Sequence, residues 1–169
     1  MKRFITLLFF LTAFLVTTSS QASIQKAQAM FIYNFSRLIE WPGTASGDFV
    51  IGVLGSPDLT KHLQDYTTGK KAGAQSIAIQ EFRDAAGISN CQILFVAYGK
   101  TRDLPEIQTK VGSQPTVIIT EKRGAIDEGA ALNFLIVGNS LKFEIKPSNA
   151  TSKGIKLSSK LQEMATEVY

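Results

Sequence analysis

Apolar residues recur at helical spacing between Ile24 and Trp41, at Ala27, Phe31, Phe35 and Leu38, with Met30 and Ile39 widening the stripe. This period predicts one amphipathic helix whose apolar face packs on a core. The pair Pro42-Gly43 follows directly and should end the helix.

Short apolar runs alternate with helical patterns over the next eighty or so residues of the chain. Strands are predicted at Phe49–Leu54, Gln92–Val96 and Thr116–Thr120, with a weaker one at Ser76–Phe82. Helices are predicted between them, at Leu59–Tyr66 and Leu104–Val111. Continuous apolar strands that alternate with helices are typical of a parallel sheet covered on both faces.

A hairpin is predicted where this pattern changes. The runs Ala131–Val137 and Ser140–Lys146 flank Gly138-Asn139, a two-residue turn, so these strands should be antiparallel. In the second run apolar residues alternate with charged ones, which places one face on the core and the other in water. The core face is Leu141, Phe143 and Ile145, and the water face is Lys142, Glu144 and Lys146.

The C-terminal segment has the signals of a final helix. Ser159-Lys-Leu-Gln162 has the spacing of a capping box, and Leu161, Met164, Ala165 and Val168 follow at helical intervals. Together the elements predict a single three-layer α/β sandwich. Its central sheet is mostly parallel, with the C-terminal antiparallel hairpin at one edge and helices on both faces.

The N-terminus has the three parts of an export signal. Lys2 and Arg3 are basic, Phe4 to Val16 is uninterruptedly apolar, and Ser20-Gln21-Ala22 is a small-x-small cleavage site. The apolar run is shorter than the roughly 20 residues that span a bilayer. We therefore predict a signal peptide over residues 1–22, and a periplasmic protein without stable membrane insertion that folds as one domain over residues 23–169.

Composition removes several classes of function. The chain has one cysteine, so no internal disulfide can form in the oxidising compartment. The 18 basic side chains fall to 16 once Lys2 and Arg3 leave, against 14 acidic ones. This balance, without a Lys/Arg run interleaved with aromatics, does not indicate a nucleic-acid partner.

Candidate catalytic and metal-binding groups are few. His62 is the only histidine, predicted to face solvent on a helix, and Cys91 opens an apolar strand where a thiol usually behaves as a buried hydrophobe. A Cys91/His62 couple would need the fold to bring them together. One histidine and one cysteine supply no ligand set for zinc. We expect no enzyme activity, metal or cofactor.

The turn Gly55-Ser56 sits where a strand hands over to a helix, which in parallel α/β sheets is a common place for ligands. Two interpretations stay open. Gly55 can simply form the turn, with Ser56 as the N-cap and Pro57 in the first helical turn. Alternatively, the turn can belong to a small-ligand sensor.

An ordered set of sequence blocks, from Lys26-Ala27 near the start of the first helix to Gly154–Leu161, resembles the family of YfiR-type periplasmic regulators. The opening blocks are Lys26-Ala27, Phe31-Ile-Tyr-Asn-Phe35 and Glu40-Trp41-Pro42. Later blocks are Phe49–Gly55, Cys91–Val96, Ala131-Leu-Asn-Phe134, Lys142-Phe-Glu-Ile145 and Gly154–Leu161. The residues that match the signature, and to which we assign structural roles, are Phe31, Asn34, Phe35, Cys91, Asn133, Phe134, Phe143, Ser158, Ser159 and Leu161.

The resemblance implies a regulator without an active site. YfiR-type proteins bind the periplasmic part of an inner-membrane diguanylate cyclase and hold it inactive, which lowers cyclic-di-GMP and biofilm formation. An outer-membrane-associated lipoprotein can sequester the regulator. Better-known members rely on paired cysteines, so the lone Cys91 puts control by an internal disulfide in doubt. Whether two copies pair stays open.

Partner-binding residues are expected among the aromatics near the end of the first helix. Tyr33 and Trp41 are amphipathic aromatics of the kind enriched at binding hot spots, and the adjacent Pro42 is assigned to the partner contact with them. A structural role is the alternative for each. Phe31, Phe35 and Leu38 fit a core stripe better than an interface.

Overall fold

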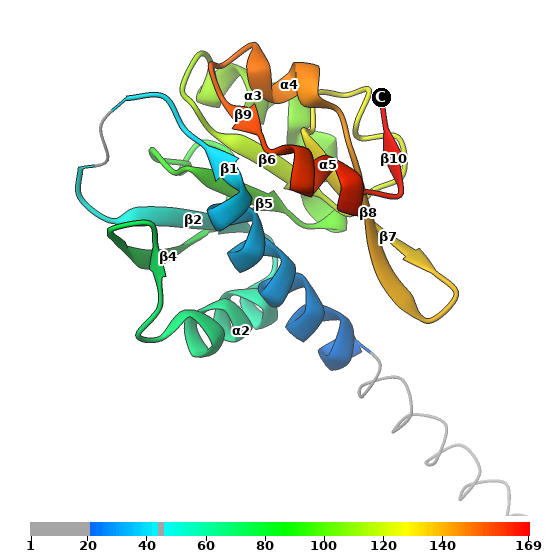
Figure 1. Ribbon diagram of the computed structural model, residues 1–169, viewed down its shortest axis with the longest axis horizontal. Coiled ribbons are helices and arrows are strands. Elements are labelled where there is room, and N and C mark those ends of the chain that lie inside the picture. Colours follow the sequence, from blue (N-terminus) through cyan, green and yellow to red (C-terminus); the bar gives the residue numbers. More distant parts are fainter. Residues whose placement is uncertain (1–20, 44–45) are drawn as a thin grey trace, which may run out of the picture.

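The computed structural model describes residues 21–43 and 46–169. The predicted signal peptide lies outside the described residues except for its last two, which belong to the N-terminal helix. That helix extends over residues 21–38 and crosses one face of a central sheet (Figure 1). No helix in the described part of the chain has the length and apolarity needed to cross a membrane.

The central sheet has eight strands in the order β10-β8-β7-β6-β5-β2-β4-β3. Pairs β2/β4, β2/β5, β5/β6, β6/β7 and β10/β8 are parallel, whereas β7/β8 and β3/β4 are antiparallel. The strands are β2 (Phe49–Leu54), β3 (Lys71–Ala72), β4 (Gln75–Phe82), β5 (Ile93–Val96), β6 (Val117–Thr120), β7 (Leu132–Val137), β8 (Ser140–Ile145) and β10 (Glu167–Val168). The predicted mostly parallel sheet is confirmed.

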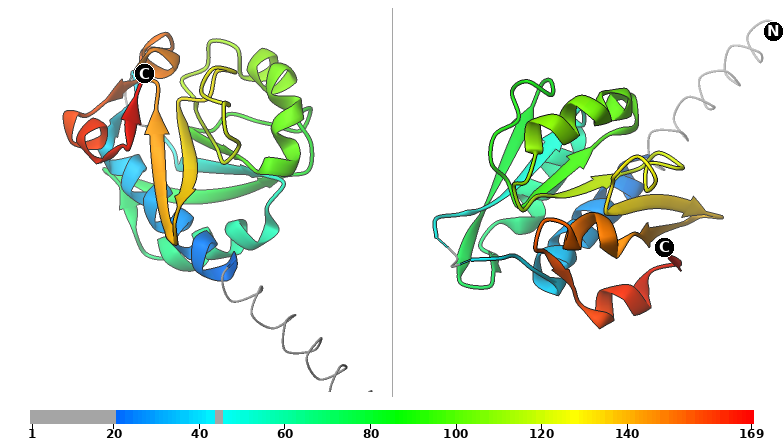
Figure 2. Two further views of the ribbon diagram at one scale, coloured as in Figure 1. Left: turned by 90° about the vertical axis from the view of Figure 1, so that its right-hand side faces the viewer. Right: turned by 90° about the horizontal axis from the view of Figure 1, so that it is seen from above.

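Helices cover both faces of this sheet, as predicted (Figure 2). The N-terminal helix, α2 (Pro57–Thr67), α4 (Pro147–Thr151) and α5 (Ser159–Met164) contribute buried residues to one core. The other core contains α3 (Leu104–Val111), which follows the 3-10 helix η1 (Tyr98–Asp103). Strand β5 separates the two, because Ile93 and Phe95 point into the first core and Leu94 and Val96 into the second.

The first helix ends earlier than its apolar period predicts. It stops at residue 38, and Ile39–Glu40 form the short strand β1, which pairs antiparallel with β9 (Lys156–Leu157). The N–H of Ser158 also donates to the carbonyl of Leu38 at 3.1 Å. Pairing with a distant segment therefore turns the chain at this point, three residues before Trp41.

The C-terminal helix is also shorter than predicted, and its cap lies one residue earlier. Ser158, rather than Ser159, is the N-cap, because its hydroxyl accepts the N–H of Leu161 at 3.2 Å. Helix α5 ends at Met164, and the N–H of Thr166 donates to the carbonyl of Phe143 at 2.8 Å. The predicted helical position of Val168 is wrong: the segment becomes β10, outside β8.

Glu144, predicted to face water, is buried at 7% exposure. Its carboxylate accepts the side-chain N–H of Asn133 at 2.8 Å, and the hydroxyl of Tyr169 lies 3.2 Å from its other oxygen. Hydrogen bonding to Glu167, burial and hydrogen bonding to Glu144 all raise the pKa of Tyr169. The C-terminal segment that adds β10 beside β8 thus covers Glu144, whereas Lys142 on the same face remains exposed as predicted.

Cys91 is a free thiol buried in the core on the α3 side, as predicted. Burial raises the pKa of this thiol well above its ordinary value, to about 12. Because the thiolate is the reactive form, we expect iodoacetamide at pH 8 to label Cys91 slowly in the native protein and rapidly in denaturant. Mass spectrometry measures the two rates, and equal rates would show that the thiol is accessible in the fold.

Candidate functional site

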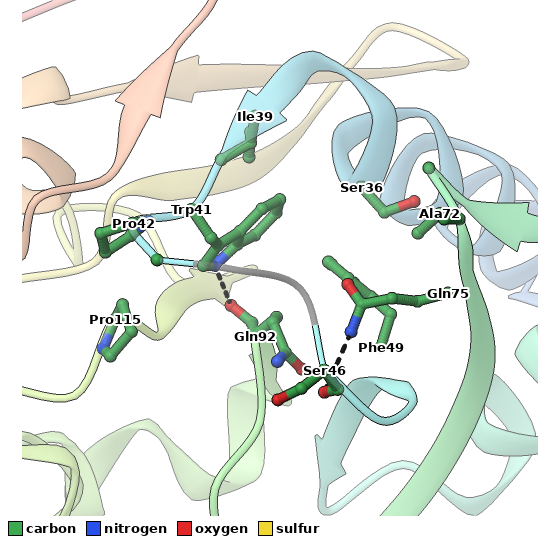
Figure 3. A pocket seen from close by; sticks show the side chains of 13 residues that line it. Ser36, Ile39, Trp41, Pro42, Ser46, Phe49, Ala72, Gln75, Gln92 and Pro115 are labelled. Atoms are coloured by element: carbon green, nitrogen blue, oxygen red, sulfur yellow. Dashed lines mark hydrogen bonds between the residues drawn. The ribbon is translucent and has the colours of Figure 1, made fainter.

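A cavity of about 300 Å³ lies at the amino ends of the parallel strands and contains two of the predicted partner-binding residues. Trp41 and Pro42 enter it from the segment after β1, Phe49 from the start of β2, and Gln92 from the residue before β5 (Figure 3). The β3–β4 turn closes another side. The full lining is Ser36, Ile39, Trp41, Pro42, Gly43, Ser46, Phe49, Ala72, Gly73, Ala74, Gln75, Gln92 and Pro115.

Trp41 is held in place by one hydrogen bond and one ring contact. Its indole N–H donates to the carbonyl of Gln92 at 3.1 Å. Its ring packs edge-on against Phe49, with centroids 4.9 Å apart. The side-chain oxygen of Gln92 accepts the N–H of Val50 at 2.7 Å, which ties the same residue to β2. A half-buried tryptophan fixed in this way is a rigid apolar surface at low entropic cost.

The polar groups of the cavity are neutral. Gln75 donates to the carbonyl of Gly47 at 3.0 Å, and Ser36 donates to the carbonyl of Tyr33 at 2.7 Å. None of the described residues that line the cavity is Asp, Glu, Lys, Arg or His. The arrangement can therefore hold an apolar or neutral group by contact and hydrogen bonding, but it places no general acid or base there.

Tyr33 lies away from this cavity, between the N-terminal helix and α2. Its ring contacts that of Tyr66 edge-on at 5.7 Å. The ammonium of Lys70 lies 3.3 Å from the Tyr66 ring centroid and 5.0 Å from that of Tyr33. The structure therefore does not bring Tyr33 together with Trp41 and Pro42.

Gly55 and Ser56 form the turn and the N-cap of α2, which is the first of the two interpretations that the sequence leaves open. The Ser56 hydroxyl accepts the N–H of Leu59 at 3.4 Å as N-cap, with Pro57 in the first turn. Gly55 has a φ of +83°, and a Cβ there would lie 2.5 Å from Cγ of Lys100. The turn lies at the carboxyl end of β2, where the strand order reverses, and the side chain of Lys100 packs beside the still exposed Gly55.

A carboxylate that the sequence analysis missed lies at the same carboxyl edge of the sheet. Glu121 follows β6, and its two oxygens accept the backbone N–H of Tyr98 at 3.0 Å and the side-chain amide of Gln28 at 2.7 Å. Gln28 is itself buried. The Gln28–Glu121 bond joins the N-terminal helix to the sheet, so two donors that could meet a ligand are engaged by the protein itself.

His62 and Cys91 are not brought together. His62 is half-buried rather than facing solvent as predicted, because it lines a groove between α2 and the N-terminal helix beside Met30 and Tyr66. Cys91 belongs to the core on the other face of the sheet. Among residues 21–43 and 46–169, no group of three or more His, Cys, Asp or Glu side chains could hold a metal ion.

The residues that match the family signature are mainly structural in their placement. Phe35, Cys91, Asn133, Phe134, Phe143 and Leu161 are buried, Phe31, Asn34 and Ser158 are half-buried, and Ser159 is exposed. The phenylalanines form one cluster on the first core, with the Phe35 and Phe143 ring centroids 5.0 Å apart. The phenylalanine cluster holds the N-terminal helix on the sheet.

Comparison with known proteins gives a family match and two similar folds. A family model described as YfiR/HmsC-like matches residues 25–166. A conserved domain protein from Vibrio cholerae O1 biovar eltor has a TM-score of 0.59 and 9% identity, over 86% of this chain and 60% of that one. The ABC domain from Streptococcus pneumonia, solved in complex with L-Trp, has a TM-score of 0.51 and 13% identity, over 71% and 55%.

At these identities the two solved structures show the fold alone, and this chain spans less than two thirds of the length of either. A search of curated proteins gave no match. The family match, in contrast, covers every helix and strand described above except β10 and the first residues of the N-terminal helix.

Proposed function

Because the chain belongs to the YfiR/HmsC-like family, we propose that it is a periplasmic regulator that binds a membrane-bound diguanylate cyclase and represses it. Repression would lower cyclic-di-GMP and biofilm formation. The partner is the periplasmic part of the cyclase, and an outer-membrane-associated lipoprotein is the proposed antagonist that sequesters the regulator. The observation that carries the proposal is the family match over residues 25–166.

The geometry of the described residues supports a binding role. The cavity at the amino ends of the strands presents a fixed indole, an exposed proline and neutral hydrogen-bonding groups. Such a surface suits an apolar side chain of a partner protein, because anchors of this type carry most of the energy in protein interfaces. We assign Trp41 and Pro42 to the partner contact. Tyr33 is assigned to a second contact on the helix face.

Binding can be tested with the purified regulator and the periplasmic segment of a membrane-bound diguanylate cyclase from the same organism. We expect a stable complex, and replacement of Trp41 by alanine should weaken it about 30-fold, the effect of losing a central aromatic anchor. Calorimetry measures the affinity. The matched control is Tyr98→Ala, which removes an exposed aromatic at the opposite end of the sheet and should leave the affinity unchanged.

The cellular counterpart is the level of cyclic-di-GMP after deletion of the gene, which should rise. Unchanged cyclic-di-GMP together with no association in vitro would exclude the regulator proposal. Stabilisation of the protein by a small metabolite in a thermal-shift screen, in the absence of cyclase binding, would instead favour a small-ligand sensor. In that case the Trp41 cavity is a better candidate site than Gly55 and Ser56, because the Ser56 hydroxyl is engaged as the N-cap of α2.

A further inference from the structure

Strand β4 leaves most of its outer edge open. All of residues 77–82 pair with β2 on the inner side, whereas only Gln75 and Ser76 pair with β3 on the outer side. Within the described chain no other strand lies beyond β4. Figure 1 shows this strand at the left side of the sheet, next to the end of α2. An open edge of this length presents unpaired backbone groups to any extended chain that approaches it.

The register shows which backbone groups point outward. The carbonyls of Val50 and Leu54 accept N–H groups from the β5 side of the sheet. Because successive residues of a strand point their backbone groups to opposite sides, the N–H and C=O of Ile51 point toward β4. In a parallel ladder, Ile51 hydrogen-bonds to the residues directly before and after its register partner, Ile79, so the backbone groups of Ile79 itself point away from β2. The outward N–H and C=O groups therefore belong to Ile77, Ile79 and Glu81.

A groove of about 420 Å³ runs beside this edge. Thr67 and Thr68, at the end of α2, form one side, and Ile77 and Ile79 of β4 form the other. The end of α2 thus lies beside the last long strand of the sheet. A strand added to β4 would be covered on one face by α2, as the existing strands are covered by helices.

The groove carries positive charge only. Lys70 and Lys71 line it, and no carboxylate does. The Lys70 ammonium rests on the ring of Tyr66, and the described residues give neither lysine an ion-pair partner. This charge favours a segment that carries an aspartate or glutamate.

We propose that the outer edge of β4 binds an extended acidic segment of another protein, which adds as a further strand and places a carboxylate beside Lys70 and Lys71. This mode of recognition takes affinity from main-chain hydrogen bonds and specificity from side chains along the groove. The surface is separate from the Trp41 cavity, although both border the β3–β4 turn. It is therefore an additional contact, independent of the proposed repression.

A second copy of this chain fits the edge less well. Antiparallel pairing opposes outward-facing residues to each other, so a two-fold pairing would centre on Ile79 and place Arg83 of one copy opposite Gln75 of the other. Strand β3, which carries Lys71, already pairs with the outer side of Gln75 and Ser76, so this dimer would press Arg83 of one copy against β3 of the other and bring two cations together at each end. An acidic segment from a different protein avoids this repulsion.

The test uses a labelled peptide of about eight residues, of alternating threonine and valine with two glutamates at one end, titrated with the whole protein by fluorescence anisotropy. We expect saturable binding, and about fivefold weaker binding to Lys71→Glu, the loss of one exposed ion pair. Lys110→Glu, a charge reversal on exposed α3, should bind the peptide like the unaltered protein. A peptide with lysines in place of the glutamates should bind more weakly.

Main-chain pairing is tested by the same peptide methylated on alternate backbone nitrogens, in the two possible phases. One phase should abolish binding and the other should not, because only alternate N–H groups of an edge strand face its neighbour. Equal binding of both methylated peptides, or no binding of either charged peptide, would overturn the proposal. Concentration-dependent dimerisation that Glu81→Pro abolishes would assign the edge to a second copy instead, and would also overturn it.

Discussion

Replacement of Phe35 by alanine should lower the free energy of unfolding by about 3–5 kcal/mol, the usual cost of removing a buried phenylalanine. The side chain is fully buried, and its ring centroid lies 5.0 Å from that of Phe143 and 5.9 Å from that of Phe134. The cavity left behind would lie between the N-terminal helix and strands β7 and β8, where the helix docks on the sheet. Urea denaturation followed by circular dichroism measures the change in the free energy of unfolding. In a thermal scan, the same substitution should lower the melting temperature by about 10 °C.

Met30→Ala is the matched control on the same helix. Met30 is 45% exposed, so its truncation should cost less than about 1 kcal/mol. If Phe35→Ala weakened partner binding with unaltered stability, Phe35 would be an interface residue, contrary to its position in the core. The comparison therefore separates a structural signature residue from a functional one.

The central sheet could be predicted because its central strands carry apolar side chains on both faces. In the predicted strand Gln92–Val96, residues Ile93–Val96 are apolar without interruption, which is typical of a strand buried on both sides, and these four residues form β5. The hairpin could also be predicted, because Gly138-Asn139 is a residue pair that forms two-residue turns between antiparallel strands, here β7 and β8. Helix α3 has the predicted bounds, Leu104–Val111, because both its apolar period and its proline are local signals.

The short strands could not be predicted, because they depend on a distant partner. Ile39–Glu40 continues the apolar period of a helix, and only its pairing with Lys156–Leu157 makes it extended. Likewise, nothing local distinguishes the segment after Met164 from a helix, and it becomes β10 because the edge of β8 accepts it. Local propensity yields to tertiary hydrogen bonds in both segments.

The candidate site was predictable in its residues and not in its geometry. Trp41 and Pro42 stand out by type, but the indole position follows from Gln92, about fifty residues later in the chain. The turn at Gly55 attracts attention because of its place after a strand. Its neighbour Lys100 comes from a segment that only the fold brings near. Glu121 carries no motif, so its bonds to Gln28 and Tyr98 could not be anticipated.

The buried polar chain across β6, β7 and β8 makes a second strong prediction, because Asn133 joins two groups that water does not reach. Thr120 donates to its side-chain oxygen at 2.6 Å, and its amide donates to Glu144 at 2.8 Å. All three residues are buried. Asn133→Leu keeps the volume and leaves a hydroxyl and a carboxylate without this partner, so we expect a loss of about 2–4 kcal/mol in urea denaturation.

A double-mutant cycle with Glu144→Gln separates this cost from simple misfit of the leucine. In the Asn133→Leu background the carboxylate has lost its amide donor, and neutralising it should recover about 1 kcal/mol or more relative to the sum of the single variants. Asn90→Leu, in an exposed loop, is the matched control and should change stability by less than about 0.5 kcal/mol. Strict additivity of the two substitutions would mean that the hydrogen bond between Asn133 and Glu144 contributes nothing, and that packing alone explains why this asparagine lies in the sheet.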